Sequence, residues 1–235
     1  MGLFKGMISL GGLYCDGIAQ RRPTRPWIID LSAMQPCPGI DPGNAADFTS
    51  APQMSRWRIG DTPDDADEQL KWVMIEDGGR TLLLCDRVIL FRVSWDDLDG
   101  EGLVDGRSIA VDRREYRCRL MTGGSRFRTE NHGYSGALPA ANEWDRFVGG
   151  EEPVAGLPRP SATDLDGTLD EIDRVGPHNR VWNWWGAHSW TQTPFDGRST
   201  ARCCRGYHSA GYFYLNTHSH RHEDIGWRPV LELVA

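Results

Sequence analysis

Residues 202–233 contain two kinds of position. We call the positions that constrain the backbone the frame, and the polar and aromatic side chains carried between them the filling. The frame includes Arg205–Tyr207 and Asp224–Pro229, which contain two Gly, one Trp and one Pro. Glycine allows backbone conformations that other residues avoid, proline lacks the backbone donor, and tryptophan requires a large buried space. This part of the chain is therefore constrained to one backbone, on which the remaining side chains are carried.

The filling residues share a relationship in the genetic code. His, Tyr, Asp, Ser, Thr and Ile are each reached from an Asn codon by changing one adenine, and Leu by changing two. A repetitive Asn-rich segment results when Asn216 is kept and Asn replaces the other filling residues, which are His208, Tyr212, Tyr214, Leu215, His218, His220 and His222. Variation in this segment is thus confined to positions that suit an Asn codon.

This pattern resembles the variable proteins of diversity-generating retroelements. In those systems an error-prone reverse transcriptase miscopies adenines of a template repeat, and the altered copy replaces the end of a gene. The resemblance spans residues 72–233 and includes Cys118–Ser125, Asn142–Val148 and Val181–Trp190. It implies a C-type-lectin-like fold of the formylglycine-generating-enzyme branch, with a hypervariable ligand-binding surface.

We therefore expect an α+β chain with a C-type-lectin-like fold, built from small antiparallel sheets, short helices and long loops. Aliphatic and β-branched residues on both sides of Gly78-Gly79 predict a hairpin. Residues 106–111 and 115–122 are two further predicted strands.

The chain is expected to divide near residue 70. Residues 1–70 contain prolines at short intervals and are interpreted as a Pro-rich arm or docking segment. Their apolar clusters indicate that they pack against the same domain or against a neighbouring copy. Residues 71–235 are expected to form the variable domain.

Composition excludes several classes of protein. The 235 residues include 27 Gly, 14 Pro and 10 Trp, which favours a loop-rich globular chain, and the net charge of −7 argues against nucleic-acid binding. The six Cys form no CxxC pair, so reduced thiols are expected. No apolar run reaches the length of a membrane span, and no signal peptide is recognised, so a soluble cytoplasmic or phage-virion protein is expected.

The resemblance assigns two roles within the C-terminal segment. The variable ligand-binding positions are His208, Tyr212, Tyr214, Leu215, Asn216, His218, His220 and His222, with Cys203 and Cys204 bordering them. The scaffold positions are Gly206, Tyr207, Phe213, Gly226, Trp227, Arg228 and Pro229.

Several core residues are predicted beside these. Trp182, Trp184 and Trp190 have even spacing, which predicts packing on one face of a strand. Trp227 and Pro229 are expected to anchor the closing strand, and Arg228 is expected to pair with a buried carboxylate.

A short helix is predicted after residue 141. Asn142 is expected to cap it, and Trp144, Phe147 and Val148 then fall on its buried side.

A zinc site and an oxidase centre are two alternative functions that the residues support less well than ligand binding. In an extended strand His218, His220 and His222 would share one face and offer a zinc site, but no carboxylate or Cys is placed to complete it. Oxidases of the formylglycine-generating branch use paired Cys separated by a few residues, whereas Cys203 and Cys204 are adjacent. We expect no catalytic residue, metal or cofactor.

The sequence thus predicts a non-enzymatic protein, bacterial or from a phage, that binds an unknown protein or carbohydrate ligand. The first alternative is a phage tail or virion assembly protein, with a homo-oligomer or phage structural proteins as its partners. The second is a metal-dependent oxidase of the formylglycine-generating type.

Overall fold

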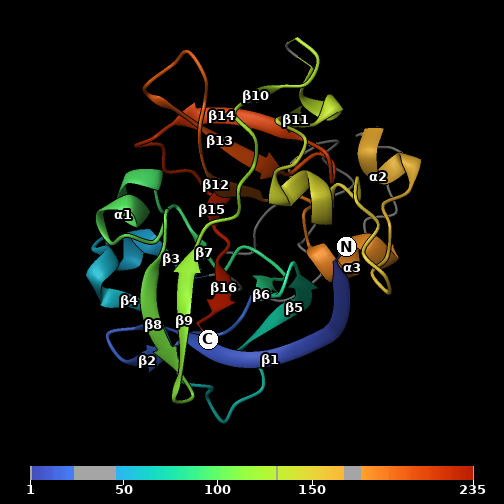
Figure 1. The fold of residues 1–235 in the computed structure, drawn as a ribbon. Coiled ribbons are helices and arrows are strands. Elements are labelled where there is room, and N and C mark those ends of the chain that lie inside the picture. The colour runs from blue at the N-terminus through green and yellow to red at the C-terminus, as the bar shows by residue number, and fades with distance from the viewer. Residues whose placement is uncertain (1, 24–45, 131, 167–175, 235) are drawn as a thin grey trace, which may run out of the picture.

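A computed structural model describes residues 2–23, 46–130, 132–166 and 176–234 (Figure 1). Over these ranges the largest sheet has eight strands, in the order β2-β1-β5-β6-β16-β9-β8, with β4 also paired to β1. Its strands are β1 (Leu3–Cys15), β2 (Ile18–Ala19), β4 (Trp57–Gly60), β5 (Gln69–Asp77), β6 (Arg80–Cys85), β8 (Arg107–Val111), β9 (Arg114–Arg119) and β16 (Val230–Leu233).

A second sheet has six strands, in the order β14-β13-β12-β15-β7-β3, and β10 and β11 form a separate pair. These strands are β3 (Ala46–Asp47), β7 (Leu90–Phe91), β10 (Arg126–Phe127), β11 (Ala137–Leu138), β12 (His188–Pro194), β13 (Ala201–Gly206), β14 (Phe213–Thr217) and β15 (Ile225–Trp227). The expectation of small antiparallel sheets is wrong here, because β12 pairs with β15, and β3 with β7, in parallel.

The helices are short, as expected for this α+β chain. They are the 3-10 helices Phe48–Ser50, Met54–Arg56 and Gly133–Ser135, the π-helix Trp144–Val148, α1 (Trp95–Gly100), α2 (Ala162–Asp166) and α3 (Pro177–Trp182). Within the described ranges, none of them has the length and apolar character needed to cross a membrane.

The predicted hairpin at Gly78-Gly79 is confirmed, and so are the two further predicted strands. β5 and β6 pair antiparallel from Trp72 to Asp77, and Gly78 and Gly79 connect them with φ angles of 57° and 83°. Two successive positive φ angles match the twist of a tight hairpin, and glycine adopts them without steric cost. β8 and β9 form the second hairpin.

The N-terminal segment packs into the same core as the residues that follow it. β1 pairs with β5 along Leu3–Gly12, and with β4 along Gly12–Cys15. Trp57 is 2% exposed and belongs to the core cluster that also contains Trp72. The described residues of 1–70 therefore dock on their own domain, one of the two arrangements expected for this segment, while residues 24–45 lie outside the described ranges.

The frame segment Asp224–Pro229 connects the two large sheets. β15 ends at Trp227, between β12 and β7, and β16 begins at Val230, between β6 and β9. Gly226 lies so close to β7 that an added Cβ would stand 2.1 Å from the carbonyl oxygen of Leu90. The predicted closing strand is therefore two strands in two sheets, and its glycine is required by a backbone contact.

Arg228, at the crossing between the sheets, does not pair with a buried carboxylate, so that expectation is wrong. Its guanidinium is 1% exposed and donates to the backbone carbonyls of Asp86, Trp182 and Asn183. The carboxylate of Asp86 is instead bonded by Arg87. Burial lowers the pKa of Arg228 to about 10, which leaves it charged at neutral pH.

The Trp-rich run is buried, as predicted, but not on one strand face. Trp182 ends α3, Trp184 follows in a loop, and only Trp190 lies in β12. Trp182 and Trp184 belong to one core cluster and Trp190 to the other. Even spacing was misleading because the helix and loop do not alternate their side chains as a strand does.

The short helix predicted after residue 141 is confirmed as a π-helix. The side-chain oxygen of Asn142 accepts a hydrogen bond from the backbone N–H of Asp145 at 2.9 Å. Trp144, Phe147 and Val148 are at most 1% exposed.

Candidate functional site

The C-terminal segment forms one end of the molecule. β13 and β14 pair antiparallel from Ala201 to Arg205, and Figure 1 places them at the end opposite β1. Residues 207–212 connect these strands, and residues 218–224 lead from β14 to β15. The filling residues lie in these two connections and on β14.

Exposure divides the two sets of residues that the sequence distinguishes. The residues expected as scaffold are all buried, and these are Gly206, Tyr207, Phe213, Gly226, Trp227, Arg228 and Pro229. The filling residues are all partly or well exposed, and these are His208, Tyr212, Tyr214, Leu215, Asn216, His218, His220 and His222. Each frame residue can therefore pack in the interior without depending on which side chain fills a neighbouring exposed position.

Six aromatic and imidazole rings form a continuous cluster, which we call the aromatic face: Tyr134, His188, Tyr207, His208, Tyr212 and Tyr214. His188 is stacked between Tyr207, with ring centroids 4.6 Å apart, and Tyr214, at 5.6 Å. Tyr212 lies 6.1 Å from Tyr214 in a stacked arrangement and 4.8 Å from His208 edge to face. The filling rings thus rest on rings that belong to buried positions.

Burial makes three groups of the aromatic face harder to charge. Burial lowers the pKa of His188 to about 3, with smaller contributions from His208, His220 and His222. Burial also lowers the pKa of His208 and raises that of Tyr212 to about 12. The face can therefore contact a ligand without desolvating charges on these three groups.

Residues 218–222 lie in a turn and loop, so they do not form the extended strand on which the zinc-site alternative depended. His220 and His222 are stacked 5.8 Å apart, while His218 pairs with Asp96 and His222 with Asp224. No group of three or more His, Cys, Asp or Glu is arranged to hold a metal ion within the ranges that the structure describes.

The loop is held in place by Arg221, which lies between His220 and His222. Its guanidinium donates two hydrogen bonds to Asp97, at 2.8 and 3.0 Å. The same carboxylate completes the capping box of α1 with Ser94. An arginine between two exposed imidazoles therefore ties their backbone to a fixed helix.

Arg205 performs the same task for residues 207–212. It is fully buried and pairs with Asp145, which is 1% exposed. It also donates to the carbonyl oxygens of Gly211, at 3.0 Å, and Tyr212, at 3.1 Å. The backbone that carries the aromatic face is thus bonded to a buried ion pair.

Cys203 and Cys204 do not border the surface, contrary to expectation. Both are fully buried, and they belong to different hydrophobic clusters because adjacent strand residues point to opposite faces. Burial raises the pKa of Cys203 to about 12 and that of Cys204 well above its ordinary value. Both residues pair through the backbone with filling residues of β14, Cys203 with Leu215 and Cys204 with Tyr214, and the sulfur of Cys204 accepts from Asn216 at 3.8 Å.

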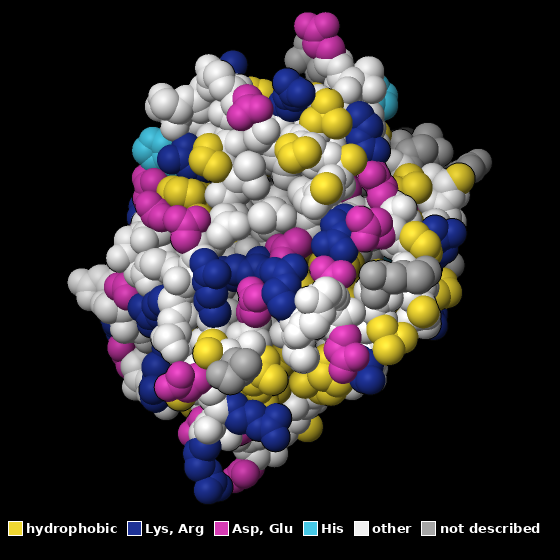
Figure 2. Space-filling model, in the orientation of Figure 1, with side chains coloured by type: hydrophobic (Ala, Val, Ile, Leu, Met, Phe, Trp, Pro, Cys, Tyr) yellow, Lys and Arg dark blue, Asp and Glu magenta, His cyan; other side chains and the backbone are white. Residues whose placement is uncertain are grey.

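A polar groove of about 230 Å³ lies on the eight-stranded sheet. It is lined by Arg80, Arg117, Arg119, Thr122, Glu143, Gln192 and Glu232. Figure 2 shows Lys, Arg and acidic side chains gathered at the centre of this face. Arg119 bonds both carboxylate oxygens of Glu143, at 2.6 and 2.7 Å. The groove was not predicted, because its residues are contributed by segments distant in the sequence.

Substitutions in the filling are expected to leave stability almost unchanged. His220→Asn and Tyr214→Asn should each shift the free energy of unfolding by no more than about 0.5 kcal/mol, because neither side chain is buried. Urea denaturation followed by tryptophan fluorescence measures the shift. Losses comparable to those of core substitutions would contradict the division between frame and filling.

Stability is expected to fall in mild acid because of His188. Its pKa is near 3 in the folded chain and about 6.5 when unfolded, so between these values only the unfolded chain binds the proton. The stabilisation is complete above about pH 6.5 and is lost as the pH falls, by up to about 1.4 kcal/mol per pH unit. His178, with a pKa of about 4, adds to the same trend.

Urea denaturation between pH 4 and pH 7 tests this dependence. In His188→Phe the free energy of unfolding should fall less steeply as the pH decreases. The slope should be smaller by up to about 1.4 kcal/mol per pH unit, because one fewer proton is bound on unfolding. Equal slopes for the two proteins would show that His188 is not the group responsible.

Two members of the aromatic face were not predicted from the sequence. His188 lies in the Trp-rich run and Tyr134 in the 3-10 helix Gly133–Ser135, both outside the C-terminal segment. Their proximity to the filling arises because segments distant in the sequence pack side by side, and no local sequence pattern indicates this.

Comparison of the chain with protein-family models, with curated proteins and with solved structures finds no match.

Proposed function

We propose that this chain is a ligand-binding protein with a C-type-lectin-like fold, whose C-terminal surface is diversified by a retroelement through adenine mutagenesis. The observation that carries the proposal is the exposure of the filling positions. All eight filling residues suit an Asn codon and are partly or well exposed, whereas the seven residues expected as scaffold are buried.

The chemistry of the aromatic face supports a role in recognition. Tyrosine provides a large contact area and a hydroxyl group at a small cost in conformational entropy, and it is enriched in adaptable binding surfaces. Tyr212 and Tyr214 supply such groups beside His208. The ligand is a protein or a carbohydrate, which these rings contact by stacking and hydrogen bonding.

The backbone around the face supports exchange of its side chains. Arg205 and Arg221 anchor the two connections through Asp145 and Asp97, and none of these four residues belongs to the filling. A new side chain at a filling position therefore changes the surface without removing an anchor. The protein acts by presenting this surface, without catalysis.

The DNA beside the gene tests the proposed origin. We expect a near-identical repeat with Asn codons at the filling positions, next to a reverse-transcriptase gene. A neighbourhood without either would overturn diversification by a retroelement.

A display library tests the proposed binding surface. The eight filling positions are randomised together, and binders are selected against hen egg-white lysozyme and against immobilised mannan as probes. We expect folded binders whose affinity is lost when the filling is returned to Asn. A matched library randomises exposed positions of the β8–β9 hairpin, namely Ser108, Ala110, Arg113, Arg114, Glu115 and Arg117. Equal yields of binders from both libraries, or mostly unfolded members of the first, would contradict the proposal.

A further inference from the structure

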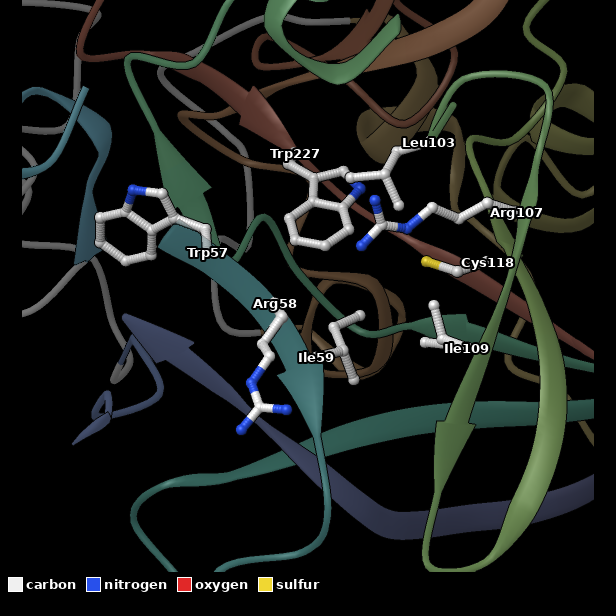
Figure 3. A pocket seen from close by; sticks show the side chains of 8 residues that line it. All are labelled: Trp57, Arg58, Ile59, Leu103, Arg107, Ile109, Cys118 and Trp227. Carbon is white, nitrogen blue, oxygen red and sulfur yellow. The ribbon is translucent and has the colours of Figure 1, made fainter. Parts of the chain in front are cut away.

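A small cavity lies where β4, β8, β9 and β15 meet, and Figure 3 shows the eight side chains that line it. Its volume is about 10 Å³. That is room for a single atom of about the size of water, and too little for a phosphate, a sulfate or a carboxylate. The cavity borders Trp227 of the frame and lies apart from the filling residues.

Two N–H donors converge on this cavity. Trp227 is 1% exposed, and its indole nitrogen has no acceptor among the residues that the structure describes. Figure 3 shows this nitrogen and the guanidinium of Arg107 pointing toward each other. One nitrogen of Arg107 donates to Glu101, at 2.8 Å from the carboxylate oxygen, which leaves further N–H groups of the guanidinium available.

The lining side chains offer donors without matching acceptors. They are Trp, Arg, Ile, Leu and Cys, and none of these side chains contains oxygen. Burial raises the pKa of Cys118 to about 12, so its sulfur remains a neutral thiol and a weak acceptor. A water molecule at this position would need acceptors for its own hydrogens, whereas a halide ion only accepts.

Charge also favours an anion. The guanidinium of Arg107 faces the cavity, the Arg58 residue lines it with its guanidinium pointing away, and no carboxylate lines it. Glu101 balances part of the charge of Arg107 from outside the lining. The side chain of Arg107 is 39% exposed, which gives a small ion a route from solvent.

We propose that this cavity binds a single chloride ion, which accepts hydrogen bonds from the indole N–H of Trp227 and the guanidinium of Arg107. The ion joins β8 of the eight-stranded sheet to β15 of the six-stranded sheet. The ion stabilises the frame and takes no part in ligand binding. A test of the chloride site therefore neither supports nor contradicts the proposed function.

Crystals grown in sodium bromide locate the ion directly in the unaltered protein. We expect a bromine anomalous peak within hydrogen-bonding distance of Trp227 Nε1 and Arg107. A refined water at that position, with no anomalous signal, would overturn the proposal.

Thermal unfolding tests the site in solution. Sodium chloride is exchanged for sodium gluconate at constant ionic strength, because gluconate is too large to enter. We expect the unfolding midpoint to rise with chloride, since an ion that binds only the folded chain stabilises it. Arg107→Met and Trp227→Phe should each raise the chloride concentration that gives half of this rise by at least tenfold.

Arg58→Met is the matched control. Figure 3 shows its guanidinium pointing away from Trp227 and Arg107, so this variant should keep the full response to chloride. A response of equal size in Arg107→Met and in the unaltered protein would show that chloride acts elsewhere.

Discussion

Replacing Arg205 by Met is expected to lower the free energy of unfolding by about 3 to 5 kcal/mol, because it leaves a buried carboxylate without its charged partner. Asp145 is 1% exposed and would keep only its bonds to Asn142, Ala137 and the partly exposed Arg128. The carbonyl oxygens of Gly211 and Tyr212 would lose a donor as well. Urea denaturation at neutral pH measures the loss.

The same substitution should disturb the aromatic face, because residues 207–212 would lose their anchor. Arg198→Met is a suitable control, since Arg198 is exposed and lies outside the ion pair, and its effect should stay within about 0.5 kcal/mol. If the two arginine variants lose equal stability, the buried pair does not hold this part of the chain.

Replacing Trp227 by Ala is expected to cost about 3 to 5 kcal/mol. The side chain is 1% exposed within the core cluster that contains Trp72 and Trp190, and alanine would leave a cavity where β15 meets the eight-stranded sheet. Differential scanning calorimetry and urea denaturation both measure the loss.

Ile18→Ala provides the comparison, because Ile18 is 70% exposed and its loss should be within about 0.5 kcal/mol. A Trp227→Ala protein as stable as Ile18→Ala would mean that the frame does not depend on this ring. The proposed exchange of exposed side chains would then lack its support.

Local patterns predicted much of the fold. The hairpin at Gly78-Gly79 follows from the ease with which two glycines adopt positive φ angles, and the cap at Asn142 follows from the reach of its side chain to a nearby N–H. The core position of Trp227 follows from its size and apolar character, whereas that of Phe213 was expected from the resemblance. For the hairpin, the cap and Trp227, the cause lies within a few residues of the position concerned.

Predictions that required distant contacts were wrong. Arg228 bonds carbonyl oxygens of Asp86, Trp182 and Asn183 in place of a carboxylate, and Cys204 is buried because its side chain belongs to the core cluster that contains Trp190. His220 lies in a loop, since the chain turns after β14 to reach β15. No local pattern in the sequence indicates which segments pack together at Arg228, Cys204 and His220.

The sequence by itself predicted the burial of Gly226 and Trp227, because glycine geometry and side-chain size are properties of single positions. Only the tertiary structure decided that the filling rests on His188 and Tyr134, and that the frame passes from one sheet to another at Arg228-Pro229. These features depend on strand pairings between segments far apart in the chain, whose free energy arises only when the whole core is assembled.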